Sequence, residues 1–249
     1  MDGFRVEDAG GAHVYRREGV GDWLRDGLAS GFAGVPTDRR TPIAGRGGAH
    51  FTFESPEGRV LVRIVRRGGW LSFMGERLFS ASRVFNEVRM LDAARSAGLS
   101  VPELLGFSIR GALLKRVTVV YREIEGSRTL LAEAKGGRSI ISAAKAARDL
   151  HAAGILHGDL NARNILLQAD RAILIDLDRA RPCRQAAAHR REIARLFRSL
   201  AKELGAEFAP DARALLVDAY AGGADPGLLE ECERRLAAHG RWWRLLGRH

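Results

Sequence analysis

HGDLNARNILL occupies residues 157–167, and LIDLD follows at residues 174–178. Both segments place polar side chains beside aliphatic ones. Asp159 and Asn164 stand five positions apart, and Asp176 ends the apolar run of the second segment. Short apolar runs bounded by turn residues are typical of buried strands that flank a loop. Taken singly, each polar residue reads as a cap or turn residue. Taken together, they predict a single site.

The spacing resembles the kinase catalytic loop H-x-D-L-x-x-x-N followed by a metal-binding turn. Phosphoryl transfer needs an oriented acceptor hydroxyl and neutralised phosphate charge. The resemblance implies that Asp159 orients the acceptor hydroxyl and accepts its proton. It also implies that Asn164 and Asp176 hold Mg²⁺ on the phosphates of ATP, while His157 braces the loop.

A glycine-rich segment lies upstream of this loop. Gly45, Gly47 and Gly48 precede a predicted hairpin over residues 51–65 that turns at residues 55–58. Glycines allow backbone N–H groups to approach phosphates without a Cβ clash, so we expect these three to bind ATP. The alternative is an ordinary turn.

Kinases of this type usually carry a lysine on the third strand, paired with a helical glutamate. No lysine precedes Lys115 here. Arg63 stands on the predicted strand instead, and Glu87 in the next predicted helix is its natural partner. Arginine donates two parallel hydrogen bonds to phosphate and stays charged. We therefore assign Arg63 and Glu87 to ATP binding, with a surface arginine as the alternative.

Periodicity and breaker residues predict an α+β protein with a protein-kinase-like bilobal fold. We expect a β-rich N-lobe over residues 1–125 and a mainly helical C-lobe over residues 126–249, joined near Gly126. The further predicted elements are a helix over 82–97, a strand over 117–121, a helix over 138–153, short strands over 155–157 and 172–176, and helices beyond residue 188 with breaks near Pro210 and residues 222–223.

Two departures argue against an ordinary serine/threonine protein kinase. Asp178 replaces the glycine of the usual metal-binding turn, and Asn161 replaces a common lysine. No A-P-E segment follows the turn.

The same residues resemble the bacterial lipopolysaccharide kinases, most closely those that phosphorylate 3-deoxy-D-manno-octulosonic acid (Kdo). The resemblance spans residues 44–181, and its most specific part is RIVRRGG at residues 63–69. It implies transfer of the ATP γ-phosphate to a Kdo hydroxyl on lipid A at the cytoplasmic face of the inner membrane. Leu177 and Arg163 depart from the family pattern, where phenylalanine and histidine are common.

Composition fits an anionic partner. The chain of 249 residues carries a net charge of +10, and 36 of its 40 basic residues are arginines. An arginine-rich surface would attract the Kdo carboxylate and lipid A phosphates, although codon bias and a solvated surface would give the same count. No basic run with interleaved aromatics indicates nucleic acid.

Two segments combine arginines with aromatic residues, namely 66–74 and 241–248. Such segments suit the headgroup region of a bilayer, so we expect peripheral membrane contact; packing onto the core is the alternative. The sequence shows no apolar run of membrane-spanning length and no signal-peptide pattern. Cys183 and Cys232 are too few for a disulfide framework, so we expect no disulfide-linked partner and a cytoplasmic location.

Two other functions remain open. A small-molecule kinase resembling aminoglycoside or choline phosphotransferases would share His-Gly-Asp-Leu, but the basic charge balance disfavours it. A nucleotide-binding pseudokinase scaffold at the membrane would not need Asp159, Asn164 and Asp176 together.

Overall fold

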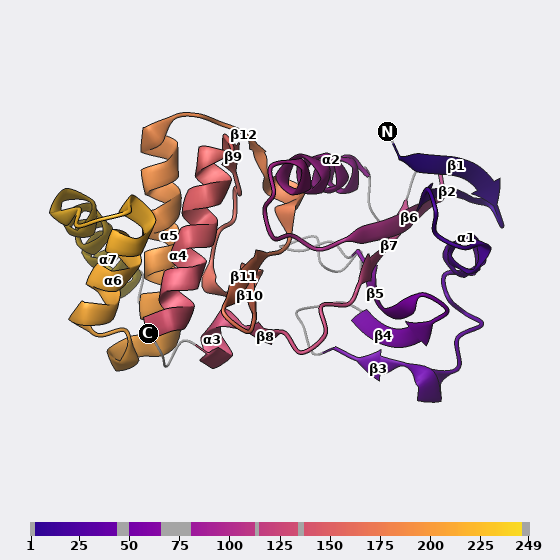
Figure 1. Ribbon diagram of the computed structural model, residues 1–249, viewed down its shortest axis with the longest axis horizontal. Coiled ribbons are helices and arrows are strands. Elements are labelled where there is room, and N and C mark those ends of the chain that lie inside the picture. Colours follow the sequence, from indigo (N-terminus) through magenta and orange to yellow (C-terminus); the bar gives the residue numbers. More distant parts are fainter. Residues whose placement is uncertain (1–2, 44–49, 66–80, 113–114, 134–136, 246–249) are drawn as a thin grey trace. The chain divides into compact units, whose positions relative to one another are not determined.

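The computed structural model describes residues 3–43, 50–65, 81–112, 115–133 and 137–245, with side chains described up to residue 238 (Figure 1). The chain forms two compact units. Residues 1–85 and 102–125 make the first unit, and residues 86–101 and 126–249 make the second.

A seven-stranded antiparallel sheet forms the first unit, in the order β1-β2-β6-β7-β5-β4-β3. Helix α1 (Asp22–Ser30) and the short 3-10 helix η1 (Thr37–Arg39) connect β2 to β3. The strands are β1 (Phe4–Ala9), β2 (Ala12–Arg17), β3 (Thr41–Pro42), β4 (His50–Ser55), β5 (Gly58–Ile64), β6 (Leu104–Arg110) and β7 (Arg116–Arg122).

Strand β5 shows how sequence alternation builds this unit. Val60 and Val62 are fully buried, and they share an apolar cluster with Leu24 and Leu28 of α1. Because successive side chains of a strand point to opposite faces, Arg63 lies on the other face, where it is half-buried.

Helices dominate the second unit. Helix α2 (Ser82–Ser96) begins in the first unit and belongs to the second from Asn86 onward, whereas the predicted N-lobe of residues 1–125 includes the whole helix. Helices α4 and α6 pack together, as do α5 and α7 (Figure 1). The remaining helices are α3 (Leu130–Glu133), α4 (Gly137–Ala152), α5 (Ala186–Leu204), η5 (Gly205–Glu207), α6 (Pro210–Ala221) and α7 (Pro226–Leu245).

Two small sheets hold the loops of the second unit. One has the order β11-β10-β8, and the other pairs β12 with β9. The strands are β8 (Arg128–Thr129), β9 (Ile155–Leu156), β10 (Ile165–Gln168), β11 (Arg171–Leu174) and β12 (Arg181–Pro182). The quoted segments therefore form strands that flank a loop, as predicted.

The structure confirms the α+β class, the 51–65 hairpin and the predicted helices. It adds β1, β2, α1 and β6, which were not predicted from the sequence. Among the described residues, no helix is both long enough and apolar enough to span a bilayer.

Candidate active site

The segment between β9 and β10 is closed by two asparagines. The side-chain amides of Asn161 and Asn164 both donate to the main-chain carbonyl of Asp159, at 2.8 and 2.9 Å. Asn161 also caps the 3-10 turn η3 (Ala162–Asn164) by accepting a hydrogen bond from the backbone N–H of Arg163. These bonds fix the backbone that carries Asp159.

Two hydrogen bonds to main-chain carbonyls join this loop to the segment that carries Asp176. The N–H of Ile175 donates to the carbonyl of Asn164 at 3.0 Å, and His157 Nε2 lies 3.0 Å from the carbonyl of Ile175. Because a carbonyl only accepts, Nε2 carries the proton of that bond. The structure thus brings the Asp159, Asn164 and Asp176 segments together, and His157 braces them from a fully buried position.

Asp176 adopts a left-handed backbone conformation, with φ 63° and ψ 55°. A non-glycine residue pays a steric cost there, and such residues concentrate at functional sites. The following turn η4 (Leu177–Arg179) is held by helix α2, since the Asn86 amide donates to the carbonyls of Asp178 and Ala180 at 3.0 and 2.8 Å.

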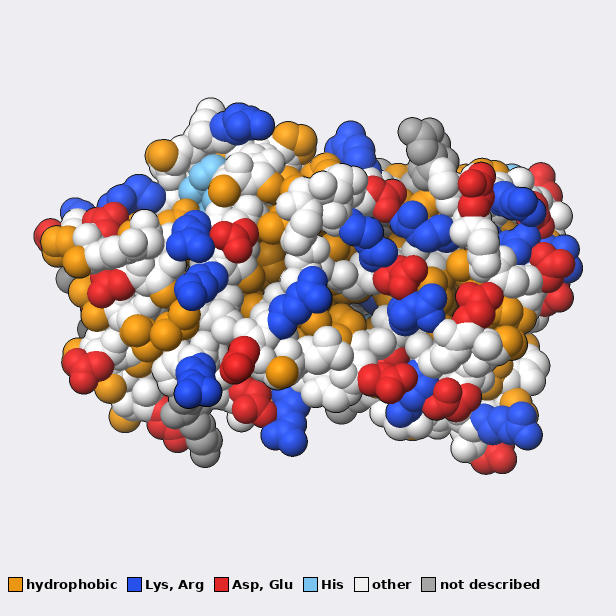
Figure 2. All heavy atoms as spheres, viewed as in Figure 1, with side chains coloured by type: hydrophobic (Ala, Val, Ile, Leu, Met, Phe, Trp, Pro, Cys, Tyr) orange, Lys and Arg blue, Asp and Glu red, His pale blue; other side chains and the backbone are white. Residues whose placement is uncertain are grey.

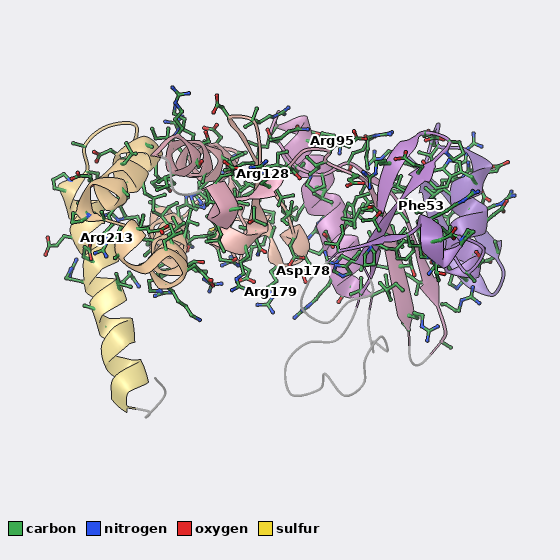
Figure 3. All side chains as sticks on the ribbon, turned by 90° about the horizontal axis from the view of Figure 1, so that it is seen from below. Phe53, Arg95, Arg128, Asp178, Arg179 and Arg213 are labelled. Atoms are coloured by element: carbon green, nitrogen blue, oxygen red, sulfur yellow. The ribbon has the colours of Figure 1, made fainter. Side chains whose placement is uncertain are left out.

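Gly158 allows the loop and the turn to approach each other. Its φ is +82°, and a Cβ added there would lie 2.3 Å from the carbonyl oxygen of Arg179. No side chain fits that gap. Figure 3 shows Asp178 and Arg179 next to each other on this turn.

The oxygen donors of the site fit a hard divalent cation. Asn164 Oδ1 accepts no hydrogen bond from the residues that the structure describes, and Asp176 supplies a carboxylate. Across the described ranges, no group of three or more His, Cys, Asp or Glu side chains forms a self-sufficient metal site. Two protein ligands suit Mg²⁺, which usually completes its shell with substrate phosphates and water.

Glu192 of α5 supports the loop, and no sequence motif indicated this residue. Its carboxylate accepts the backbone N–H groups of His157 and Gly158, at 2.9 and 2.7 Å. It also lies 2.9 Å from His151 Nε2, whose Nδ1 lies 2.8 Å from the Tyr220 hydroxyl. The Glu192 residue is only 6% exposed.

Burial and hydrogen bonding together set the protonation states within this network. Burial disfavours the charged form of Glu192, but its hydrogen bonds from His151 and the two backbone N–H groups hold its pKa below the usual range. Burial lowers the pKa of His151 and raises that of Tyr220 to about 12. A neutral His151 therefore donates to an ionised Glu192 and accepts from the Tyr220 hydroxyl.

Arg195, also on α5, reaches the candidate catalytic carboxylate directly. Its Nη1 lies 2.9 Å from Asp159 Oδ1 and 3.1 Å from the carbonyl of Gly158. Both side chains of this ion pair are partly exposed, so the pair stabilises the fold little. The ion pair instead orients the Asp159 carboxylate. Nothing near Asp159 in the sequence indicates this partner.

The other predicted ATP-binding residues lie elsewhere. Gly45, Gly47 and Gly48 fall outside the described residues, as does the segment 66–74. Arg63 belongs to the first unit, whereas Glu87 belongs to the second, where it is 3% exposed. Their pairing stays a prediction.

The solved structures of similar fold are kinases. Their sequence identities to this chain are low, so the similarity shows the fold alone. WaaP in complex with acyl carrier protein matches with a TM-score of 0.53 and 19% identity, covering 80% of this chain and 88% of that one. The amicoumacin kinase hAmiN, in complex with AMP-PNP, Ca²⁺ and Ami, matches with a TM-score of 0.59 and 12% identity, covering 81% of this chain and 80% of that one. A choline/ethanolamine kinase family protein from Mesorhizobium loti matches with a TM-score of 0.56 and 19% identity, covering 91% of this chain and 86% of that one.

No curated protein sequence gives a significant match. The family model of the lipopolysaccharide kinases (Kdo/WaaP) matches residues 41–220, which include the whole segment from Asp159 to Asp178. The chain therefore belongs to the lipopolysaccharide kinase (Kdo/WaaP) family.

Proposed function

We propose that this protein transfers the γ-phosphate of ATP to a hydroxyl of Kdo on lipid A. The observation that carries the proposal is the arrangement of Asp159, Asn164 and Asp176 in a chain of this family. Hydrogen bonds tie their segments together, at 2.9 Å from the Asn164 side-chain amide to the Asp159 carbonyl and at 3.0 Å from the Ile175 N–H to the Asn164 carbonyl.

Asp159 is the group that orients the acceptor hydroxyl and takes its proton as the oxygen attacks the γ-phosphorus. The two asparagine amides fix its backbone, and Arg195 fixes one carboxylate oxygen, Oδ1. Positioning of this kind is the main contribution that a protein makes to phosphoryl transfer.

Asn164 Oδ1 and the Asp176 carboxylate would hold Mg²⁺ against the nucleotide. When bound, the ion neutralises charge on the β- and γ-phosphates. Gly45, Gly47 and Gly48 would add backbone N–H groups, and Arg63 a guanidinium oriented by Glu87.

The acceptor carries a carboxylate and phosphates, which match an arginine-rich protein with a net charge of +10. Because lipid A sits in a bilayer, we place the enzyme in the cytoplasm, peripheral on the inner face of the inner membrane. The basic-aromatic segments 66–74 and 241–248 are the candidates for that contact.

The test is phosphate transfer from γ-labelled ATP with Mg²⁺ to four acceptors in parallel: Kdo-lipid A, a peptide mixture, an aminoglycoside and choline. We expect label on Kdo-lipid A only, removed by Asp159→Asn. Transfer to the aminoglycoside or choline alone would replace the proposal with the small-molecule kinase. ATP binding without transfer to any acceptor would favour the scaffold.

A further inference from the structure

Helix α5 carries a row of cations, one of which, Arg195, contacts Asp159. Arg191, Arg195, Arg198 and Lys202 follow each other at steps of four, three and four residues. Side chains at such spacing lie on one face of a helix, so these four form a stripe, here called the α5 basic stripe. With a rise of 1.5 Å per residue the stripe is roughly 16 Å long.

Neighbouring arginines on α5 and α7 are neutralised, unlike most of the stripe. Arg190 pairs with Glu231 at 2.8 Å, Arg235 pairs with the same carboxylate at 2.9 Å, and Arg234 pairs with Glu230. Within the part of the chain that the structure describes, Arg191, Arg198 and Lys202 make no ion pair with a carboxylate.

Arg198 is the unusual member, because it is half-buried and has no carboxylate partner among the described residues. Two other cations act on its guanidinium, Arg195 on the same helix and Arg235 of α7, which packs alongside α5 (Figure 1). Burial, and then the charges of these two arginines, lower the pKa of Arg198. A lowered pKa means that the charged form of Arg198 is destabilised at this position. Full exposure to solvent would remove that destabilisation, and so would a bound oxyanion.

We infer that Arg198, with Arg195 and the rest of the α5 basic stripe, binds an anionic group of the acceptor glycolipid. The group is a phosphate or a carboxylate, since the guanidinium fork suits both. The inference rests on the proposed function, and it names the surface that holds the acceptor while its hydroxyl meets Asp159. Figure 2 shows that basic and acidic side chains are mixed over the visible face of the helical unit, so an all-cation stripe departs from the general surface pattern.

The test compares Arg198→Gln and Arg198→Lys with Arg234→Gln. Arg234 is an exposed arginine of α7 paired with Glu230, so its replacement removes the same charge away from the stripe. The first readout is the KM for Kdo-lipid A and for ATP. We expect Arg198→Gln to raise the acceptor KM roughly tenfold or more, because hydrogen bonds to charged groups are strong, and to leave the ATP KM unchanged. Arg198→Lys should lie between, and Arg234→Gln should match the wild type.

The second readout is equilibrium binding of diphosphorylated lipid A and of its dephosphorylated form, which needs no turnover. Wild-type protein should prefer the phosphorylated form, and Arg198→Gln should lose most of that preference. If Kdo-lipid A is not phosphorylated but this binding still depends on Arg198, the proposed acceptor is wrong and the anion site stands. If Arg198→Gln and Arg234→Gln behave alike in both readouts, the anion site is wrong. Weakened binding of poly-glutamate with lipid A binding intact would overturn the inference in favour of an acidic protein partner.

Discussion

Replacing Glu192 by glutamine should damage both stability and catalysis, because one carboxylate serves three donors. It accepts the backbone N–H groups of His157 and Gly158 and the ring N–H of His151. A glutamine amide has one oxygen and one NH₂ group, so in its better orientation it still accepts from His157 and His151. Its NH₂ group then faces the N–H of Gly158, and two donors meet.

The size of the effect follows from these three bonds. Losing one charge-assisted bond and leaving its donor unsatisfied costs about 1–3 kcal/mol, and losing the charge weakens the other two bonds by about 0.5–1 kcal/mol each. We therefore expect Glu192→Gln to lower the free energy of unfolding by roughly 3 kcal/mol, which corresponds to a fall in Tm of roughly 6–12 °C. Turnover should fall by about tenfold to a hundredfold below the melting range, since the loop that carries Asp159 shifts.

The assay is thermal unfolding together with kcat at a temperature where the variant is folded. Glu203→Gln is the matched control on the same helix, because Glu203 pairs with Arg163 at the partly exposed surface. Its loss should cost no more than about 1 kcal/mol. Wild-type stability and turnover in Glu192→Gln would refute the view that this carboxylate positions the loop.

Four further outcomes are expected. Asp159→Ala should lower turnover by a factor on the order of 10² or more, with ATP binding and Tm nearly unchanged because its ion pair is partly exposed; near-wild-type turnover removes Asp159 from the mechanism. Asp176→Asn should weaken metal-dependent nucleotide binding and recover partly at high Mg²⁺; a metal held only by the second aspartate of the turn would show that our assignment is two residues off. Arg63→Ala should raise the ATP KM far more than the acceptor KM, Arg67→Ala should do the reverse, and Arg63→Lys should keep part of the activity; an unchanged ATP KM in Arg63→Ala places the phosphate clamp elsewhere. Finally, burial lowers the pKa of His151, so this side chain binds fewer protons in the folded protein than in the unfolded chain. The unfolding free energy should therefore fall as the pH drops through about 6.5. Urea titrations at several pH values check this, and a stability that rises on acidification contradicts it.

The catalytic loop could be predicted because its residues are contiguous. Asp159 and Asn164 are five positions apart, so one turn brings them together, and the short apolar runs on either side reveal the strands that present them. The fold class followed from hairpin and helix periodicities of the same local kind. In each case the information lies within one or two elements.

Strand β6 shows where local reading failed. Six of its seven residues are buried, so it lacks the alternation that marks a half-buried strand. The β1-β2 hairpin did carry a signal, the glycine pair at residues 10 and 11, which both adopt positive φ. Charged residues on the exposed face of β1 obscured the strand pattern around that turn.

Glu192 and Arg195 were missed for a different reason, since they act on the loop from more than 30 residues away. The one local sign was an acidic residue within the buried face of a helix, next to Ile193 and Ala194. A buried carboxylate needs donors, and here they are backbone N–H groups, which no side-chain pattern announces.

Helix α5 both supports the loop that carries Asp159 and carries the α5 basic stripe. Along one side, Glu192, Ser199 and Glu203 contact the loop through the backbone of residues 157, 158 and 162 and through the side chain of Arg163. The α5 basic stripe lies on the adjacent side of the helix, because Arg191, Arg198 and Lys202 each precede one of these three residues by one position. Because a helix is rigid over a few turns, the anion-binding cations keep a fixed distance from the loop that carries Asp159. Acceptor position and base position are then set by the same element, so a substitution that shifts α5, or one at Arg195, should raise the acceptor KM and lower kcat together. A substitution at Arg198 should change the acceptor KM alone.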